Sequence, residues 1–82
     1  MKDDIQEVTR EFLDALFDSP DYEPRGAFLC EDEVDGRLVY VAVDNRNGEA
    51  LTEEFMTKYA ARKYLHGNPA INRWGELLNG GK

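Results

Sequence analysis

The stretch RLVYVAVD, residues 37–44, decides the fold that this sequence predicts. From Leu38 to Val43 the side chains are β-branched, aromatic or aliphatic almost without interruption, which is typical of a β-strand. A strand without polar alternation is buried on both faces. We therefore expect residues 37–44 to lie in the centre of a sheet.

A hairpin turn precedes this strand. The segment Glu33-Val34-Asp35-Gly36 contains the Asp-Gly pair that favours tight hairpin turns. It predicts a partner strand that begins at Gly26 and runs to about Asp32. A stiff connector with Pro20 and Pro24 lies before that strand.

A second turn, NRNG at residues 45–48, follows the strand and leaves two interpretations of the next segment. In one, Thr52 caps a helix that runs to His66. In the other, residues 49–55 form a third strand and Thr57 caps a shorter helix over residues 58–66. We favour the third strand, because a hairpin of two strands alone would be poorly stabilised.

Helical periodicity is clearest over Asp3–Asp18, which Asp3 or Asp4 would cap. One buried stripe is predicted by the spacing of Ile5, Val8, Phe12, Leu13 and Leu16. Ser19-Pro20 ends this helix, because a residue before proline disfavours the helical conformation. A last helix begins at Asn68 and Pro69 and presents Ile71, Trp74, Leu77 and Leu78.

These elements predict an α+β fold in a single domain, residues 1–82. The expected sheet is small and antiparallel, with two or three strands. Three helices pack on one of its faces, and the order along the chain is α-β-β-(β)-α-α.

The net charge of −7 is distributed unevenly along the chain. Residues 1–35 carry twelve acidic and three basic side chains, whereas residues 36–82 carry five acidic and seven basic ones. At 100° per residue, one arc of about 80° on the first predicted helix collects five carboxylates: Asp3, Glu7, Glu11, Asp14 and Asp18. Four more surround the predicted hairpin turn: Glu31, Asp32, Glu33 and Asp35.

Two interpretations of these carboxylates stay open. They form a solvated surface that keeps the protein soluble, or they bind lysine and arginine side chains of a partner. The second interpretation gains weight from the segregation, because solubility alone does not require the basic residues to be sorted away.

The residue types that catalysis needs are scarce. The one histidine, His66, stands at a predicted helix end, where a capping role is expected. The one cysteine, Cys30, lies in an apolar run that is typical of a buried strand. The sequence has no nucleophile, phosphate-loop or zinc motif, and residues 32–36 lack the spacing of an EF-hand. We predict that the protein is not an enzyme and holds no metal or cofactor.

Composition also bears on location and on nucleic acids. The acidic N-terminus lacks the apolar core of a secretion signal, and no apolar run approaches the roughly 20 residues that span a bilayer. We expect a soluble, cytoplasmic protein that does not act at a membrane. A pI near 4.5 opposes direct contact with nucleic acid.

In length, acidity and predicted α-β-β-β-α-α order, the chain resembles the small phage-encoded anti-CRISPR proteins, which block RNA-guided nucleases by imitating DNA. The segments YVAVDN (40–45) and NGE (47–49), with Phe55 and the helix that holds Ala61, Tyr64 and Leu65, look similar to small proteins of bacterial mobile elements. The first resemblance implies an inhibitor that occupies the basic groove of a nucleic-acid-binding protein, such as a nuclease or its complex. It rests on no shared motif, so no residue role is carried over from it.

A different class of function stays open beside this one. The chain would then be a structural or regulatory domain that self-associates as a dimer, with the carboxylates serving only solubility. In that case Trp74 is an interface anchor. We favour a core position for Trp74, because the chain has few other large residues that can close the end of the sheet.

Overall fold

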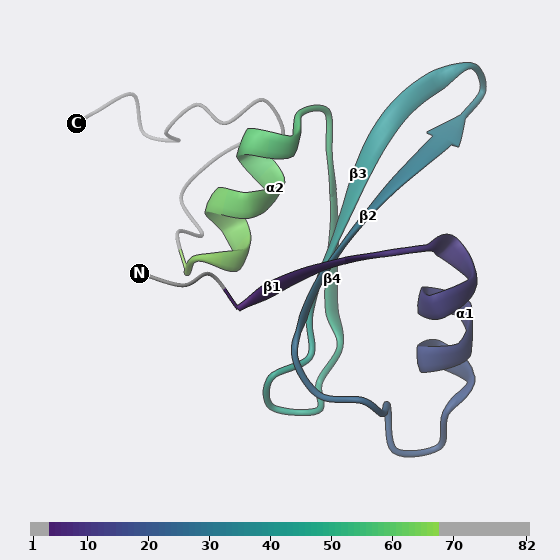
Figure 1. Ribbon diagram of the computed structural model, residues 1–82, viewed down its shortest axis with the longest axis vertical. Helices are drawn as coiled ribbons and strands as arrows, with labels where there is room; N and C mark the ends of the chain where they lie inside the picture. The colour runs from purple at the N-terminus through teal and green to yellow at the C-terminus, as the bar shows by residue number, and fades with distance from the viewer. Residues whose placement is uncertain (1–3, 68–82) are drawn as a thin grey trace.

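The computed structural model describes residues 4–67, which form a four-stranded sheet with one helix on each face (Figure 1). The strands follow the order β1-β2-β3-β4 across the sheet. β1 is parallel to β2, and the other neighbours are antiparallel. The predicted α+β class is confirmed, but the sheet is mixed and has four strands, so the prediction of an antiparallel sheet of two or three strands is wrong. The bounds are β1 Ile5–Val8, α1 Arg10–Asp18, β2 Ala27–Val34, β3 Arg37–Asp44, β4 Leu51–Phe55 and α2 Lys58–Leu65.

The predicted central strand is confirmed. β3 pairs with β2 on one side and with β4 on the other, and Val39, Val41, Ala42 and Val43 are buried. Asp35 and Gly36 form the two-residue turn between β2 and β3 with φ of 53° and 79°. Positive φ at both positions is what the type I′ hairpin turn requires.

The prediction of a third strand followed by a short helix over residues 49–66 is also confirmed. β4 is the third strand of the meander, and Thr57 caps α2 by accepting a hydrogen bond from the backbone N–H of Ala60 at 3.1 Å. His66 occupies the C-cap of α2, as the sequence predicted.

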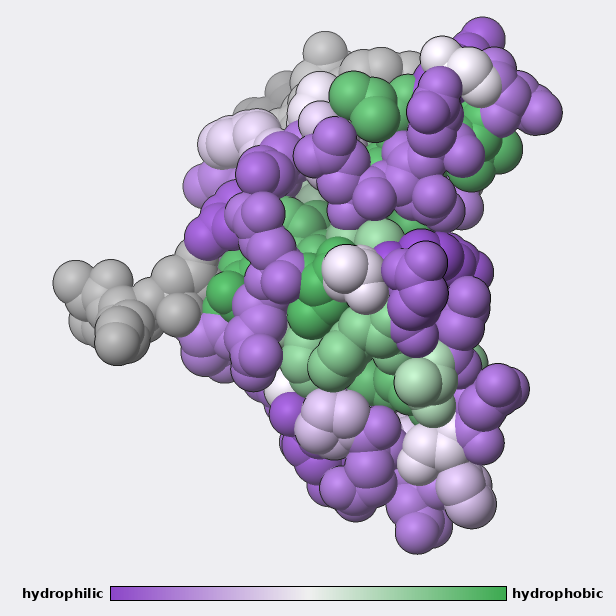
Figure 2. Space-filling model, turned by 45° about the vertical axis from the view of Figure 1, so that its right-hand side comes forward, coloured by the Kyte–Doolittle hydropathy of each residue, from purple (hydrophilic) through white to green (hydrophobic). Residues whose placement is uncertain are grey.

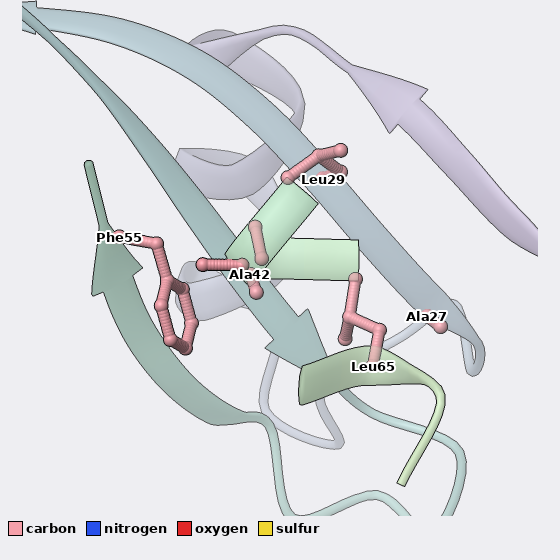
Figure 3. Packing of buried hydrophobic residues seen from close by; sticks show 7 residues of the cluster. Ala27, Leu29, Ala42, Phe55 and Leu65 are labelled. Carbon is pink, nitrogen blue, oxygen red and sulfur yellow. The ribbon is translucent and has the colours of Figure 1, made fainter. Parts of the chain in front are cut away.

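The helices cover opposite faces of the sheet, so the prediction that they share one face is wrong (Figure 1). Alternate residues of β2 and β3 point to the two sides. Towards α2 the core holds Ala27, Leu29, Ala42, Phe55, Ala60, Ala61 and Leu65 (Figure 3). Towards α1 it holds Leu13, Leu16, Phe28, Cys30, Val41 and Val43. Because both central strands are apolar on both faces, each face needs a cover.

The N-terminal helix prediction is wrong over residues 5–8, which form strand β1. Residues three apart, such as Ile5 and Val8, share one face of a helix but point to opposite faces of a strand. The structure uses the second arrangement, with Ile5 against the α2-side core and Val8 against the α1-side core. Thr9 then caps α1 in place of Asp3 or Asp4, and its Oγ1 accepts from the Phe12 N–H at 3.1 Å.

The side chain of Asn45 connects two loops by hydrogen bonds at one end of the sheet. Its side chain is fully buried, and its Nδ2 donates to the carbonyls of Tyr22 at 2.7 Å and Pro24 at 2.8 Å. Its Oδ1 accepts from the Ala50 N–H at 3.0 Å. The segment before β2 and the turn before β4 are thereby held in place by one amide. The predicted last helix lies outside the described residues.

Candidate protein-binding surface

The predicted stripe of five carboxylates on one helix does not form, because its first members are not on α1. Glu7 lies on β1, on the α2 side, and its Oε2 is 3.1 Å from Lys58 Nζ and 3.8 Å from Arg62 Nη1. Asp3 lies outside the described residues. Glu11, Asp14 and Asp18 remain exposed on α1.

A second ion-pair group neutralises Asp4, which comes just before β1. Arg46 donates from Nε and Nη2 to the two Asp4 carboxylate oxygens, each at 3.1 Å. The same guanidinium donates to the Leu65 carbonyl at 2.9 Å and pairs with Asp44 at 3.2 Å. The hydrogen bond with Arg46 lowers the pKa of Asp4. The sequence segregation of charge is therefore partly undone, because bases of the C-terminal half pair with acids of the N-terminal half.

The carboxylates on the α1 side of the sheet are grouped around Arg10, the first residue of α1. Arg10 Nε donates to Asp14 Oδ1 at 3.2 Å, and Arg10 Nη1 lies 3.7 Å from Asp32 Oδ2. Cys30 lies beneath this group. Burial, followed by the charge of Asp32, raises the pKa of its thiol, and Glu11 and Asp14 add to the effect. The buried position that the sequence predicted for Cys30 is confirmed.

The four hairpin carboxylates are divided between the two sides of the sheet. Strand alternation places Asp32 on the α1 side with Phe28 and Cys30, and it places Glu31 and Glu33 on the α2 side. Asp35 lies at the turn. The predicted hairpin cluster is therefore two groups facing opposite ways.

Next to Asp32, the α1 side of the hairpin is hollowed. A shallow cavity of about 350 Å³ is lined by Val34, Asp35, Arg37, Val39, Glu54 and Met56. We call the carboxylates of Glu11, Asp14, Asp32, Asp35 and Glu54 the acidic face. Figure 2, with the α1 side turned towards the viewer, shows hydrophilic residues around a hydrophobic patch.

Glu53 and Glu54 on β4 were not singled out from the sequence. Both are exposed, and within residues 4–67 neither is part of an ion pair. The signal was present, because consecutive acidic residues put a charge on both faces of a strand, which is typical of an edge strand.

The basic residues gather on α2 instead. Tyr59, Arg62, Lys63 and His66 line a second hollow of about 270 Å³, and Lys63 Nζ lies 5.5 Å from the centre of the Tyr59 ring. The two helices thus differ in charge, because the exposed acidic residues Glu11, Asp14 and Asp18 lie on α1 and the basic residues Lys58, Arg62 and Lys63 lie on α2.

In the described part of the chain, no three His, Cys, Asp or Glu side chains gather as a metal site. None of the helices there is long and apolar enough to cross a membrane. Comparison of the chain with protein families, curated proteins and solved structures finds no match. Trp74, the predicted alternative interface residue, lies outside the described residues.

Proposed function

We propose that this protein is a small inhibitor that binds a basic surface of a nucleic-acid-binding protein through its acidic face. The observation that supports the proposal most directly is the charge of that face. Five carboxylates lie on this side, three of them from α1 and β2, and Arg10 pairs with two of them, Asp14 and Asp32. The protein acts by binding, without catalysis or a cofactor.

Attraction between opposite charges would guide the encounter, and Arg or Lys side chains of the partner would then donate charge-assisted hydrogen bonds to the carboxylates. The imitation of DNA is coarse. Glu11 and Asp14 are three residues apart, which is about 4.5 Å along the helix axis. A DNA strand presents one charge every 3.4 Å or so. A nuclease or its complex, inhibited in the anti-CRISPR manner by a phage or mobile-element protein, is the partner class that the resemblance implies.

The test is affinity capture from bacterial lysate with two charge-matched variants. The first, Glu11→Gln/Asp14→Asn/Asp32→Asn, removes three charges of the acidic face. The second, Asp18→Asn/Asp21→Asn/Glu23→Gln, removes three exposed charges at the far end of α1 and in the connector. The wild type and the second variant should capture the same basic protein, and the first variant should lose it.

Two elution experiments distinguish specific capture from non-specific adsorption. Duplex DNA should elute the captured protein. Raising NaCl from about 0.1 to about 1 M shortens the Debye length from about 10 to about 3 Å and should also release it. Equal capture by the two variants, or no elution by DNA, would rule out the acidic face as the binding surface. A dimer that captures nothing would favour the alternative of a self-associating domain.

A further inference from the structure

Among the described strands, β4 lies at one edge of the sheet, and its outward backbone groups can be assigned from one pair of hydrogen bonds. Gly26 and Asn45 exchange both of their N–H···O bonds, at 3.2 and 2.7 Å, and they continue the register in which Ala27 is opposite Asp44. In antiparallel sheets such exchanged pairs alternate along a strand. The odd-numbered residues of β3 therefore bond to β2, and the even-numbered ones bond to β4.

The same alternation fixes β4. Asp44, Ala42 and Tyr40 are opposite Leu51, Glu53 and Phe55, so these three β4 residues turn their backbone groups towards β3. Thr52 and Glu54 turn their N–H and C=O groups away from β3. Within residues 4–67, β3 is the only strand that pairs with β4. The outer edge thus offers two donors and two acceptors to a further strand.

The side chains along this edge are acidic on both faces of the sheet. Glu53 projects to the α2 side and Glu54 to the α1 side, where it borders the hollow that Val39 and Met56 help to line. Leu51, beside Glu53 on the α2 side, is 52% exposed. An added strand would therefore meet a carboxylate on each face, apolar surface at Leu51, and the hollow beyond Glu54.

A second copy of this chain is a poor occupant of the edge. An antiparallel pair of two β4 strands would bring Glu53 and Glu54 of one copy beside those of the other, and like charges across strands are destabilising. The opposite edge of the sheet differs, because Glu7 on β1 is paired with Lys58 and Arg62. The charge on β4 selects a cationic strand.

We propose that the outer edge of β4 binds an extended segment of the partner protein by strand addition, and that this segment carries two consecutive Lys or Arg residues. Consecutive residues of a strand point to opposite faces, so one cation would lie beside Glu53 and the next beside Glu54. Two residues beyond the cation at Glu54, an apolar side chain would enter the hollow. Main-chain hydrogen bonds at Thr52 and Glu54 supply affinity, and the side chains supply specificity. This inference rests on the proposed function, to which it adds the segment that is recognised.

The probe is a capped peptide, Val-Thr-Lys-Lys-Thr-Val, whose palindromic sequence presents the same pattern in parallel and antiparallel orientation. It is titrated into the isotope-labelled full chain and followed by NMR. We expect saturable shifts of the Thr52 and Glu54 amides, with slower hydrogen exchange of both amide protons. A control peptide with Glu-Glu in place of Lys-Lys should not bind.

Two variants test the backbone and the charge separately. Thr52→Pro removes a donor that does not bond to β3, so the sheet should persist, and peptide affinity should fall at least about tenfold. Glu53→Gln/Glu54→Gln keeps the backbone and should weaken binding about fivefold, the range expected for two exposed pairs. The double variant keeps the proposal falsifiable if Thr52→Pro fails to fold.

The outcomes distinguish this inference from the proposed function. The acidic-face variant Glu11→Gln/Asp14→Asn/Asp32→Asn should bind the peptide like the wild type. Capture of the lysate partner that is unaffected by both β4 variants would overturn the strand addition and leave the proposed function standing. Absence of peptide binding, or equal binding of the Glu-Glu peptide, would also overturn it. Concentration-dependent shifts of Thr52 and Glu54 without peptide would show that a second copy occupies the edge.

Discussion

The two edges of the sheet carry similar acidic residues and treat them in opposite ways. Beside β1, Asp4 is held by two hydrogen bonds from Arg46, and Glu7 pairs with Lys58 and Arg62. On β4, Glu53 and Glu54 are exposed and have no ion pair within residues 4–67. The acidic residues at the β1 edge form ion pairs with other parts of the fold, whereas those at the β4 edge point outwards into solvent.

The difference shows that a carboxylate's role depends on which bases the fold brings within reach. Glu7 belonged to the predicted binding stripe, yet in the structure it connects β1 to α2. Glu53 and Glu54 were not among the predicted site residues, yet both are exposed and have no ion pair within residues 4–67. A run of acidic residues thus identifies candidates, and the register of the strands decides between them.

The largest effect is expected at Asn45, which supports the end of the sheet that both edges share. Asn45→Ala would leave the Tyr22 and Pro24 carbonyls and the Ala50 N–H without their bonds. Loss of these three part-buried hydrogen bonds should lower the free energy of unfolding by about 2–4 kcal/mol, measured by urea denaturation. Asn47→Ala, an exposed site in the same turn, should change it by less than about 0.5 kcal/mol. Similar small changes in both variants would contradict the bridging role of Asn45.

Charge reversal compares the two edges directly. Glu7→Lys would place a third cation beside Lys58 and Arg62 and should cost about 1 kcal/mol of folding stability. Glu54→Lys breaks no ion pair with another residue of the range 4–67 and should stay within about 0.5 kcal/mol of the wild type. Thermal and urea denaturation of the two variants provide the measurement. Equal destabilisation would mean that the edges do not differ in the way proposed.

The sequence predicted well where one pattern allowed one structure. The run from Leu38 to Val43 favours a strand that is buried over most of its length, and Asp35-Gly36 favours a tight turn, so β3 and its hairpin were predicted correctly. Ile5 and Val8 fit both a helical stripe and a short strand, because a spacing of three suits either. Residues 5–8 form a strand because they pair with β2, which lies about twenty residues further along the chain. The hydrogen bonds of the Asn45 amide could not be predicted from the sequence either, because Tyr22 and Pro24 come close to Asn45 only in the folded chain.

A smaller effect is expected in the acid titration of Asp4, beside the β1 edge of the sheet. The hydrogen bond with Arg46 lowers the pKa of Asp4, so Asp4 contributes stability above its unfolded pKa that is lost as the pH falls through its folded pKa. The contribution is constant at neutral pH, begins to fall near the unfolded pKa of about 4, and is lost as the pH drops below the folded pKa. In Arg46→Gln the pKa of Asp4 should rise towards its ordinary value, as measured by NMR of the side-chain carboxyl. Arg37→Gln, on the hairpin, should leave the Asp4 titration unchanged.

The smallest effect tests whether the negative charge of Glu53, on the β4 edge, lacks a neighbouring cation. Burial raises the pKa of Tyr64, and the negative charge of Glu53 raises it further. Because a neighbouring anion disfavours tyrosinate, Glu53→Gln should lower the pKa of Tyr64, whereas Glu54→Gln, on the other face of β4, should not. Ultraviolet absorbance of tyrosinate, with Tyr64→Phe subtracted to isolate this residue, reports the change. If Glu53→Gln leaves the Tyr64 pKa where it was, a cation already screens Glu53, and the contrast between the two edges disappears.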